Sequence, residues 1–217
     1  MSSWLSRIDW VNKFVDLIGV FAGVTIAFAL TNWQEGRKSE VLHRQYLVAL
    51  QSDLRRDLVN IGNDLITLDT LAIKNAGCMA YAKGRKIPSD SIEYFLSGVM
   101  VQTVFHPNIA AFESIIAAGD LAEFTDVSFV TNLTELYHGE YANIKELDQI
   151  GLNNLQDRVI ARMLEEESFE EKYLRSKSFH NLAFLIDGIN QQKKRACLDA
   201  KGLAEKIIAV IDNKLNT

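Results

Sequence analysis

The stretch LVALQSDLRRDLVNIGNDLITL, residues 47–68, determines the fold class of this chain. Its apolar residues recur at spacings of three and four, which aligns them along one side of an α-helix. The pattern predicts a long helix from about residue 40 to residue 75. Such a stripe is typical of a coiled coil, and equally of one helix in a monomeric bundle. The stripe consists of Leu47, Leu50, Leu54, Leu58, Ile61, Leu65 and Leu68.

Polar residues occupy another side of the same helix and form an acidic stripe. Hard cations bind clusters of carboxylates, so a metal site is one interpretation. The interspersed Arg55 and Arg56 favour the other interpretation, a charged face in contact with solvent. We therefore expect these carboxylates to be exposed. The acidic stripe consists of Asp53, Asp57, Asn60 and Asp64.

The composition agrees with a folded helical protein. Of the 217 residues, 48% are hydrophobic and 24% are charged, a balance that excludes an intrinsically disordered chain. The chain contains only 2 prolines, and this scarcity favours long helices because proline breaks them. The net charge of −5 gives no electrostatic basis for binding nucleic acid, which requires clustered lysine and arginine.

The rest of the chain adds further helices with loops between them. The segment GCMAYAKGRKIPS, residues 77–89, is the clearest loop, since it combines glycines, basic residues and a proline. After it, Asn108 is a candidate N-cap and Gly119 a candidate C-terminal cap, with further helices expected up to residue 215. We predict an all-α fold in which residues 34–217 form an antiparallel helical bundle with short helical inserts.

A second stretch, VDLIGVFAGVTIAFALTNW at residues 15–33, is almost entirely apolar. Residues 17–30 carry no charge and would extend roughly 21 Å as a helix, whereas residues 11–33 would extend roughly 34 Å, enough for a ~30 Å hydrocarbon core. The stretch predicts an N-terminal transmembrane helix at residues 11–33 that follows a short tail, residues 1–10, and continues into the long helix as a stalk. Two alternatives remain, a signal peptide cleaved near residues 27–29 and a buried core helix.

Residues that flank this stretch are candidate anchors at a membrane–water interface. Trp10 and Trp33 stand at its two ends, where amphipathic indole rings prefer to lie. Arg37 and Lys38 follow as the charged flank expected of a retained anchor. Basic residues are nearly balanced on the two sides, so they leave the orientation open.

Small residues inside the stretch predict a helix–helix contact. Gly19, Gly23 and Ala27 recur every four residues, a spacing that lets two backbones approach closely. Asp16 lies three residues before Gly19 and therefore points to nearly the same side. We predict that these four residues face a partner helix, which belongs either to another protein or to a second copy.

Two motifs resemble those of a known family: GVTIAFALTNWQEGRK at residues 23–38 and AFESIIAAGDL at residues 111–121. With the pattern YL..L..DL..D at residues 46–57, they resemble an uncharacterised family of bacterial single-pass membrane proteins, described only as a domain of unknown function. The resemblance covers roughly residues 15–140. It implies a single-pass anchor in a bacterial inner membrane and a helical domain, and it implies no activity. The basic tails of family members would place that domain in the periplasm.

The sequence contains no strong catalytic or metal-binding signature. Glu135 and His138 have the i, i+3 spacing of carboxylate-bridged di-iron bundles, but the second ExxH that such a site needs is missing. Cys78 and Cys197 lie far apart and form no CxxC pair, so they are compatible with one disulfide and with two buried thiols. We therefore expect no cofactor, no metal and no enzymatic activity.

These observations favour a membrane-anchored helical interaction module. We expect an accessory or scaffolding subunit that oligomerises or docks to a membrane protein complex, in contact with the lipid bilayer and with a protein partner or a second copy. The alternative is a single-span, ligand-sensing helical bundle, which requires a polar pocket between helices. A remote alternative is a metal-dependent enzyme that uses Glu135 and His138.

Overall fold

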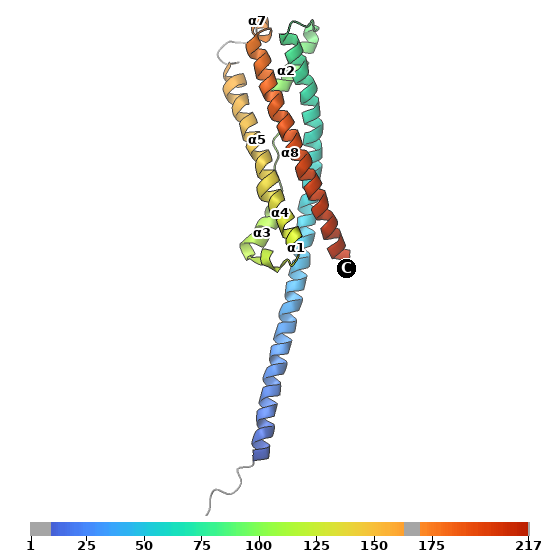
Figure 1. Cartoon of the computed structure of the whole chain (residues 1–217), viewed down its shortest axis with the longest axis vertical. Helices are drawn as coiled ribbons and strands as arrows, with labels where there is room; N and C mark the ends of the chain where they lie inside the picture. The colour runs from blue at the N-terminus through green and yellow to red at the C-terminus, as the bar shows by residue number, and fades with distance from the viewer. Residues whose placement is uncertain (1–9, 163–169, 217) are drawn as a thin grey trace, which may run out of the picture. The chain divides into compact units, whose positions relative to one another are not determined.

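The computed structural model describes residues 10–162 and 170–216, with side chains from residue 19 onward except at residues 35, 89 and 123. These residues form helices and no strand, which confirms the all-α fold with a long helix and a bundle. The chain divides into two compact units, Met1–Leu47 and Val48–Thr217. Helix α1, Trp10–Ala82, contributes to both of them (Figure 1).

In the first unit, the structure describes the N-terminal part of α1, from Trp10 to Leu47. Its large apolar side chains between Val20 and Trp33 are exposed on all sides of the helix. The apolar run among the described side chains, interrupted only by Thr25, extends from Gly19 to Leu30, roughly 18 Å of helix.

Among the described residues, no helix is both long and apolar enough to cross a bilayer. The transmembrane helix predicted at residues 11–33 is therefore unsupported. The predicted location is corrected by the same finding: a single-pass protein of a bacterial inner membrane with a periplasmic domain does not fit it.

The second unit is an antiparallel bundle around a core of leucine, isoleucine and phenylalanine side chains (Figure 1). Leu50, Leu54 and Ile61 of the predicted stripe are fully buried in it. The unit contains residues 48–82 of α1, and then α2 (Ser89–Met100), α3 (Ala110–Ala118), η1 (Asp120–Glu123), α4 (Val127–Thr134), η2 (Glu135–Glu140), α5 (Tyr141–Asn154), η3 (Leu155–Ile160), α7 (Glu171–Leu174) and α8 (Lys177–Asn216).

Helices α1 and α8 run antiparallel along the bundle (Figure 1). The Gln51 amide donates a hydrogen bond to Asp212 near the C-terminal end of α8, whereas Asp69, farther along α1, pairs with Lys194 near the middle of α8. The elements α4, η2, α5 and η3 follow one another without a break and form one long helical stretch, which packs beside α8. It contains two π-helical turns, η2 and η3.

Helix α1 continues past the predicted end near residue 75 and covers residues 77–82 of the predicted loop at residues 77–89, which leaves only residues 83–88 as the connection to α2. Gly77 explains the difference, because it serves packing rather than a turn. A Cβ atom at Gly77 would lie 2.1 Å from Cδ1 of Phe95, so the missing side chain makes room for that ring. The turn itself uses Gly84, whose φ is +90°.

The stretch of chain between the connection and α3 is helical only in its first part. Helix α2 ends at Met100, and residues 101–109 continue as an irregular segment before α3 begins. The predicted C-terminal cap of α3 is confirmed, since Gly119 has a φ of +79° and its amide donates to the carbonyl groups of the last turn. The predicted N-cap role of Asn108 is wrong: Ile109 holds that position, and Asn108 turns to α1 instead.

Candidate functional site

The irregular segment at residues 101–109 lies against the buried side of α1 and α5 and therefore needs hydrogen-bond partners for its backbone. Outside a helix or sheet, a buried amide or carbonyl group without a partner costs free energy comparable to a lost hydrogen bond. Three charged side chains from α1, α5 and α8 provide these partners, and a fourth, from α1, binds the first turn of α3, which follows the segment. They are Asp53, Asp57, Asp148 and Lys193.

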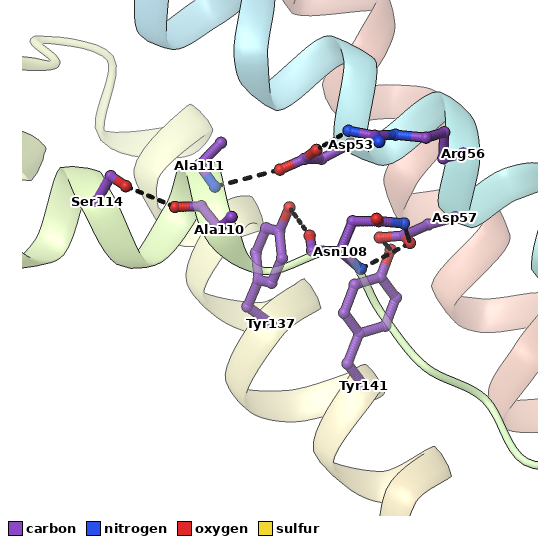
Figure 2. A network of polar contacts seen from close by, with 9 residues as sticks. All are labelled: Asp53, Arg56, Asp57, Asn108, Ala110, Ala111, Ser114, Tyr137 and Tyr141. Atoms are coloured by element: carbon purple, nitrogen blue, oxygen red, sulfur yellow. Dashed lines mark hydrogen bonds and ion pairs between the residues drawn. The ribbon is translucent and has the colours of Figure 1, made fainter.

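Asp57 holds the end of the segment. Its Oδ1 atom accepts hydrogen bonds from the backbone amide of Asn108 at 2.9 Å and from the Asn108 side-chain amide at 2.7 Å (Figure 2). Its Oδ2 atom accepts from the hydroxyl group of Tyr141 at 3.0 Å. Asp57 is fully buried, so this carboxylate exchanges water for three protein donors.

Asp53, one turn earlier on α1, holds the start of α3. Its Oδ2 atom accepts from the backbone amide of Ala111 at 3.1 Å, and its Oδ1 atom lies 2.6 Å from the guanidinium of Arg56 (Figure 2). The Ala111 amide belongs to the first turn of α3, where backbone amides lack partners within the helix. The prediction that Asp53 and Asp57 face solvent is wrong, because they bind backbone that approaches from elsewhere in the chain.

A buried ion pair holds the middle of the segment. Lys193 of α8 pairs with Asp148 of α5, and both side chains are almost completely buried. The ammonium group also donates to the carbonyl oxygen of Thr103 at 2.8 Å and to its hydroxyl oxygen at 2.7 Å. Asp148 in turn accepts from the amide of Phe105 at 2.9 Å. The segment therefore gives hydrogen-bond partners to both members of the ion pair, and a buried pair needs such additional hydrogen bonds.

Burial changes the acidity of this cluster. Desolvation raises the pKa of Asp57 above its usual value, although the hydrogen bonds from Asn108 and Tyr141 oppose the rise. Desolvation likewise raises the pKa of Tyr141 and of Tyr137, and the nearby Asp57 carboxylate adds to both rises. These groups exchange hydrogen bonds with one another and with the segment. Their arrangement supports a structural role, since it presents no nucleophile and base to a substrate.

The ExxH pair does not form a metal site in the described part of the chain. Glu135 and His138 both lie in the π-helical turn η2. The His138 ring packs against Phe112 with 5.4 Å between ring centroids, and the Glu135 side chain lies beside Gly139. Among the described residues, no group of three or more histidine, cysteine or acidic side chains could hold a metal ion. The remote metal-enzyme hypothesis therefore gains no support.

Both cysteines are buried free thiols, which answers the question that the sequence left open. The Cys78 thiol donates to the backbone carbonyl of Phe95 at 3.1 Å. Burial raises the pKa of each thiol to about 12, so neither forms the reactive thiolate at neutral pH.

The contact face predicted in the first unit is open where the structure describes it. A Cβ atom at Gly19 or at Gly23 would meet nothing within 4 Å, and Ala27 is exposed. The side chain of Asp16, predicted to share this face, lies outside the described residues. The face therefore stays a prediction.

The predicted interface anchors are exposed where they are described. Trp33 is 60% exposed, and the Arg37 guanidinium lies 4.8 Å from the centre of its ring. Lys38 is exposed as well, and the side chain of Trp10 lies outside the described residues. The roles of these four residues stay predictions too.

The outer side of α1 in the second unit carries a feature that the sequence analysis missed. Val59, Ile66 and Ile73 are 63%, 69% and 63% exposed, and they follow one another at intervals of seven residues. Gly62 and Thr70 stand between them on this side. The exposed Asp69, which pairs with Lys194, lies beside Ile66 and Ile73. We call Val59, Gly62, Ile66, Thr70 and Ile73 the outer row. The heptad interval of β-branched residues is the sequence signal that would have revealed it.

A groove adjoins the end of the outer row, and Ile73 belongs to both. The groove has a volume of about 450 Å³ and lies between α1, α2 and the connection that joins them. Ile73, Ala80 and Phe95 contribute apolar walls, and Arg85 and Lys86 contribute two exposed cations. The row and the groove together form the candidate interaction surface.

Comparisons with known proteins add no relative: no family model, no curated protein and no solved structure matches this chain. The resemblance to single-pass membrane proteins therefore stays a prediction.

Proposed function

We propose that this protein is a helical interaction module whose outer row packs against a helix of a protein partner. One observation supports the proposal most directly: three large β-branched side chains stand exposed at heptad spacing on a long, ordered helix. That spacing places them along one seam, and a second helix laid on this seam would cover all of them. The partner helix belongs either to another protein or to a second copy of the chain.

The energetics favour such a contact. Full burial of a valine or isoleucine side chain contributes roughly 1.5–3 kcal/mol, and the row offers three of them. β-branched residues on a helix have nearly fixed χ1 angles, so their burial costs little side-chain entropy. Gly62 leaves open space above the helix, which lets a partner approach closely. Together these features match the composition of helix-in-groove contacts.

Site-specific photocrosslinking of the full chain tests the proposal. A benzophenone amino acid placed at Val59, Ile66 or Ile73 should give crosslinked protein adducts at all three positions. The matched control is Asn60, which is exposed on the same helix about a third of a turn away from Ile66 and should give none. An adduct of twice the chain mass would identify a second copy as the partner.

Two results would contradict the proposal. Equal yields at Asn60 and at the outer row would show contact without a preferred face. Recovery of the protein with lipid vesicles, with adducts to lipid alone, would show that a lipid surface covers the row instead of a helix.

A polar pocket favours the alternative of a ligand-binding bundle as a second candidate. It has a volume of about 460 Å³, and Arg158, Arg162 and Asn181 are among the residues that line it. Two guanidinium groups fit a carboxylate or phosphate. Inorganic phosphate and citrate are suitable probes. Either should raise the melting temperature of the wild-type protein and leave that of Arg158→Gln unchanged, whereas no shift in either protein would count against this candidate.

A further inference from the structure

We propose that the helix received by the outer row is acidic and amphipathic: it inserts a large apolar side chain into the groove beside Ile73 and places carboxylates against Arg85 and Lys86. This inference rests on the proposed function, since it names the chemistry of the partner at the same surface. It specifies the charge of the partner helix and the end of the outer row at which that charge lies, neither of which the outer row alone defines.

The shape of the surface supports insertion of an apolar side chain. Ile73 ends the outer row and also lines the groove, so one helix that follows the row arrives at the groove. Farther along α1, the small residues Gly77 and Ala80 line the groove and leave room in it. Phe95 of α2 and Ile87 of the connection line it as well. A large side chain that becomes buried against apolar walls at the end of a helical seam is the kind of anchor that contributes most to binding.

The groove depends on the absence of a side chain at Gly77. The ring of Phe95 fills the place where a Cβ atom would stand, at 2.1 Å from Cδ1 and 2.4 Å from Cε1. Any larger residue would push the ring away and change the wall of the groove. The position of the wall is thus set by α1 itself, which makes the groove a preformed feature of the bundle.

The charges around the groove support an acidic partner. The connection KGRK at residues 83–86 presents Lys83, Arg85 and Lys86, all exposed. Within the described part of the chain, no carboxylate forms an ion pair with any of the three. The exposed acids of α2, Asp90 and Glu93, leave a positive balance there.

None of the five outer-row residues is charged, and the neighbouring Asp69 pairs with Lys194, so the cations of residues 83–86 stand at one end of an uncharged row. A partner helix with carboxylates beside its apolar residues complements this arrangement. Such exposed ion pairs act mainly on orientation and on the association rate, and salt screens them. The inference therefore predicts affinity that falls as the salt concentration rises.

Two synthetic helical peptides provide the test. Both have three heptads with leucine or isoleucine at positions a and d. One carries glutamate at e and g and the other lysine, so each repels its own copies. Fluorescence anisotropy of the labelled peptides against the full chain should show binding of the glutamate peptide at least tenfold tighter than of the lysine peptide in low salt, with a smaller ratio in 0.5 M salt.

Charge-reversed and neutral variants sharpen the test. Arg85→Gln with Lys86→Gln should weaken the glutamate peptide about tenfold, and Arg85→Glu with Lys86→Glu should reverse the preference between the peptides. Circular dichroism and the melting temperature check that each variant is folded; both residues are exposed, so we expect no change. A matched control exchanges Lys201 and Lys206 of α8 for glutamine and should leave the peptide affinities unchanged.

The outcomes separate this inference from the proposed function. Equal binding of both peptides, with crosslinks at the outer row, would overturn the acidic partner and leave the interaction module standing. Failure of the glutamate peptide to bind while the row still crosslinks would do the same. Absence of both peptide binding and row-specific crosslinks would overturn both.

Discussion

In the second unit, α1 turns one side toward the bundle and the other toward solvent, and the two sides differ in their use of charge. The inward side buries the carboxylates of Asp53 and Asp57 among fully buried leucines. The outward side exposes the large aliphatic side chains of Val59, Ile66 and Ile73. This reverses the usual distribution of charged and apolar residues between interior and surface.

The inward side of α1 therefore meets protein instead of water, and we propose that the outward side does so too. The inward carboxylates have their partners in the same chain: Asp57 binds the irregular segment at residues 101–109, and Asp53 binds the first turn of α3. The outward aliphatic side chains lack such a partner in the described chain, which is why we propose one from outside. Five predictions test this difference, from the largest expected effect to the smallest.

Asp57→Ala should cause the largest loss of stability. The substitution removes the carboxylate that accepts three hydrogen bonds. The backbone amide and the side-chain amide of Asn108 and the hydroxyl group of Tyr141 then lose this acceptor. We expect the free energy of unfolding to fall by roughly 3–5 kcal/mol in urea titrations, because each buried unsatisfied donor costs ~1–3 kcal/mol. The exposed Asn60→Ala on the same helix is the control and should change it by less than about 0.5 kcal/mol. Equal effects would refute the assigned role of the inward side.

Lys193→Met should destabilise the bundle by about 3 kcal/mol, because it leaves the Asp148 charge buried without its partner. The adjacent Lys194 forms a comparable ion pair with Asp69, but at the surface. Lys194→Met should therefore cost no more than about 1 kcal/mol. Urea titrations of the two variants measure the difference, and a similar loss in both would show that burial of the pair is unimportant.

Gly77→Ala should cost roughly 1–3 kcal/mol, because the added Cβ collides with the ring of Phe95. Gly62→Ala is the matched control on the outward side, where a Cβ meets nothing within 4 Å. It should stabilise the helix by roughly 0.5–1 kcal/mol. Thermal unfolding of both variants gives the signs directly, and stabilisation by Gly77→Ala would contradict the tight packing of α2 on α1.

Asp64→Asn should stabilise the protein at neutral pH, by less than the losses above. Burial raises the pKa of this carboxyl group above its ordinary 3.8, and the nearby Asp148 charge adds to the rise while Lys193 and His106 oppose it. A raised folded-state pKa means that the charged form is penalised at neutral pH. The penalty disappears as the pH falls through the folded pKa toward 3.8.

Urea titrations between pH 7 and pH 4 check this sign. The advantage of Asp64→Asn over the wild-type protein should shrink steadily as the pH falls. A growing advantage at low pH would mean that the folded state favours the carboxylate instead.

Ile66→Lys should have the smallest effect on folding and the clearest effect on association. Since Ile66 is 69% exposed, its replacement should change the free energy of unfolding by less than about 0.5 kcal/mol. The charge at the centre of the outer row should abolish crosslinking from Val59 and Ile73, measured as adduct yield on gels. Unchanged yields would show that no partner lies on the row.

The sequence predicted the features of the bundle that depend on neighbours along the chain. Leu50, Leu54 and Ile61 are buried as their spacing indicated, because three- and four-residue intervals fix one side of a helix whatever packs against it. Gly119 ends α3 as predicted, since a left-handed residue is needed there and glycine adopts it without strain.

The environment of the acidic stripe could not be read in this way. Asp53 and Asp57 stand beside Arg55 and Arg56, a local pattern that indicates a solvent-facing surface. Their burial depends on Asn108 and Ala111, which are more than fifty residues away in sequence. The outer row was within reach, because the heptad interval between Val59, Ile66 and Ile73 is visible in the sequence. The leucine stripe on the same helix obscured it.

The irregular segment at residues 101–109 also has a consequence for the order of folding. Its hydrogen bonds join it to residues 43 to 90 positions away, on α1, α5 and α8. Such distant pairings form only after the entropy of closing long loops has been overcome, whereas helices form locally and early. We therefore expect the segment to take its final position last in folding, after α1, α5 and α8 have formed and packed together.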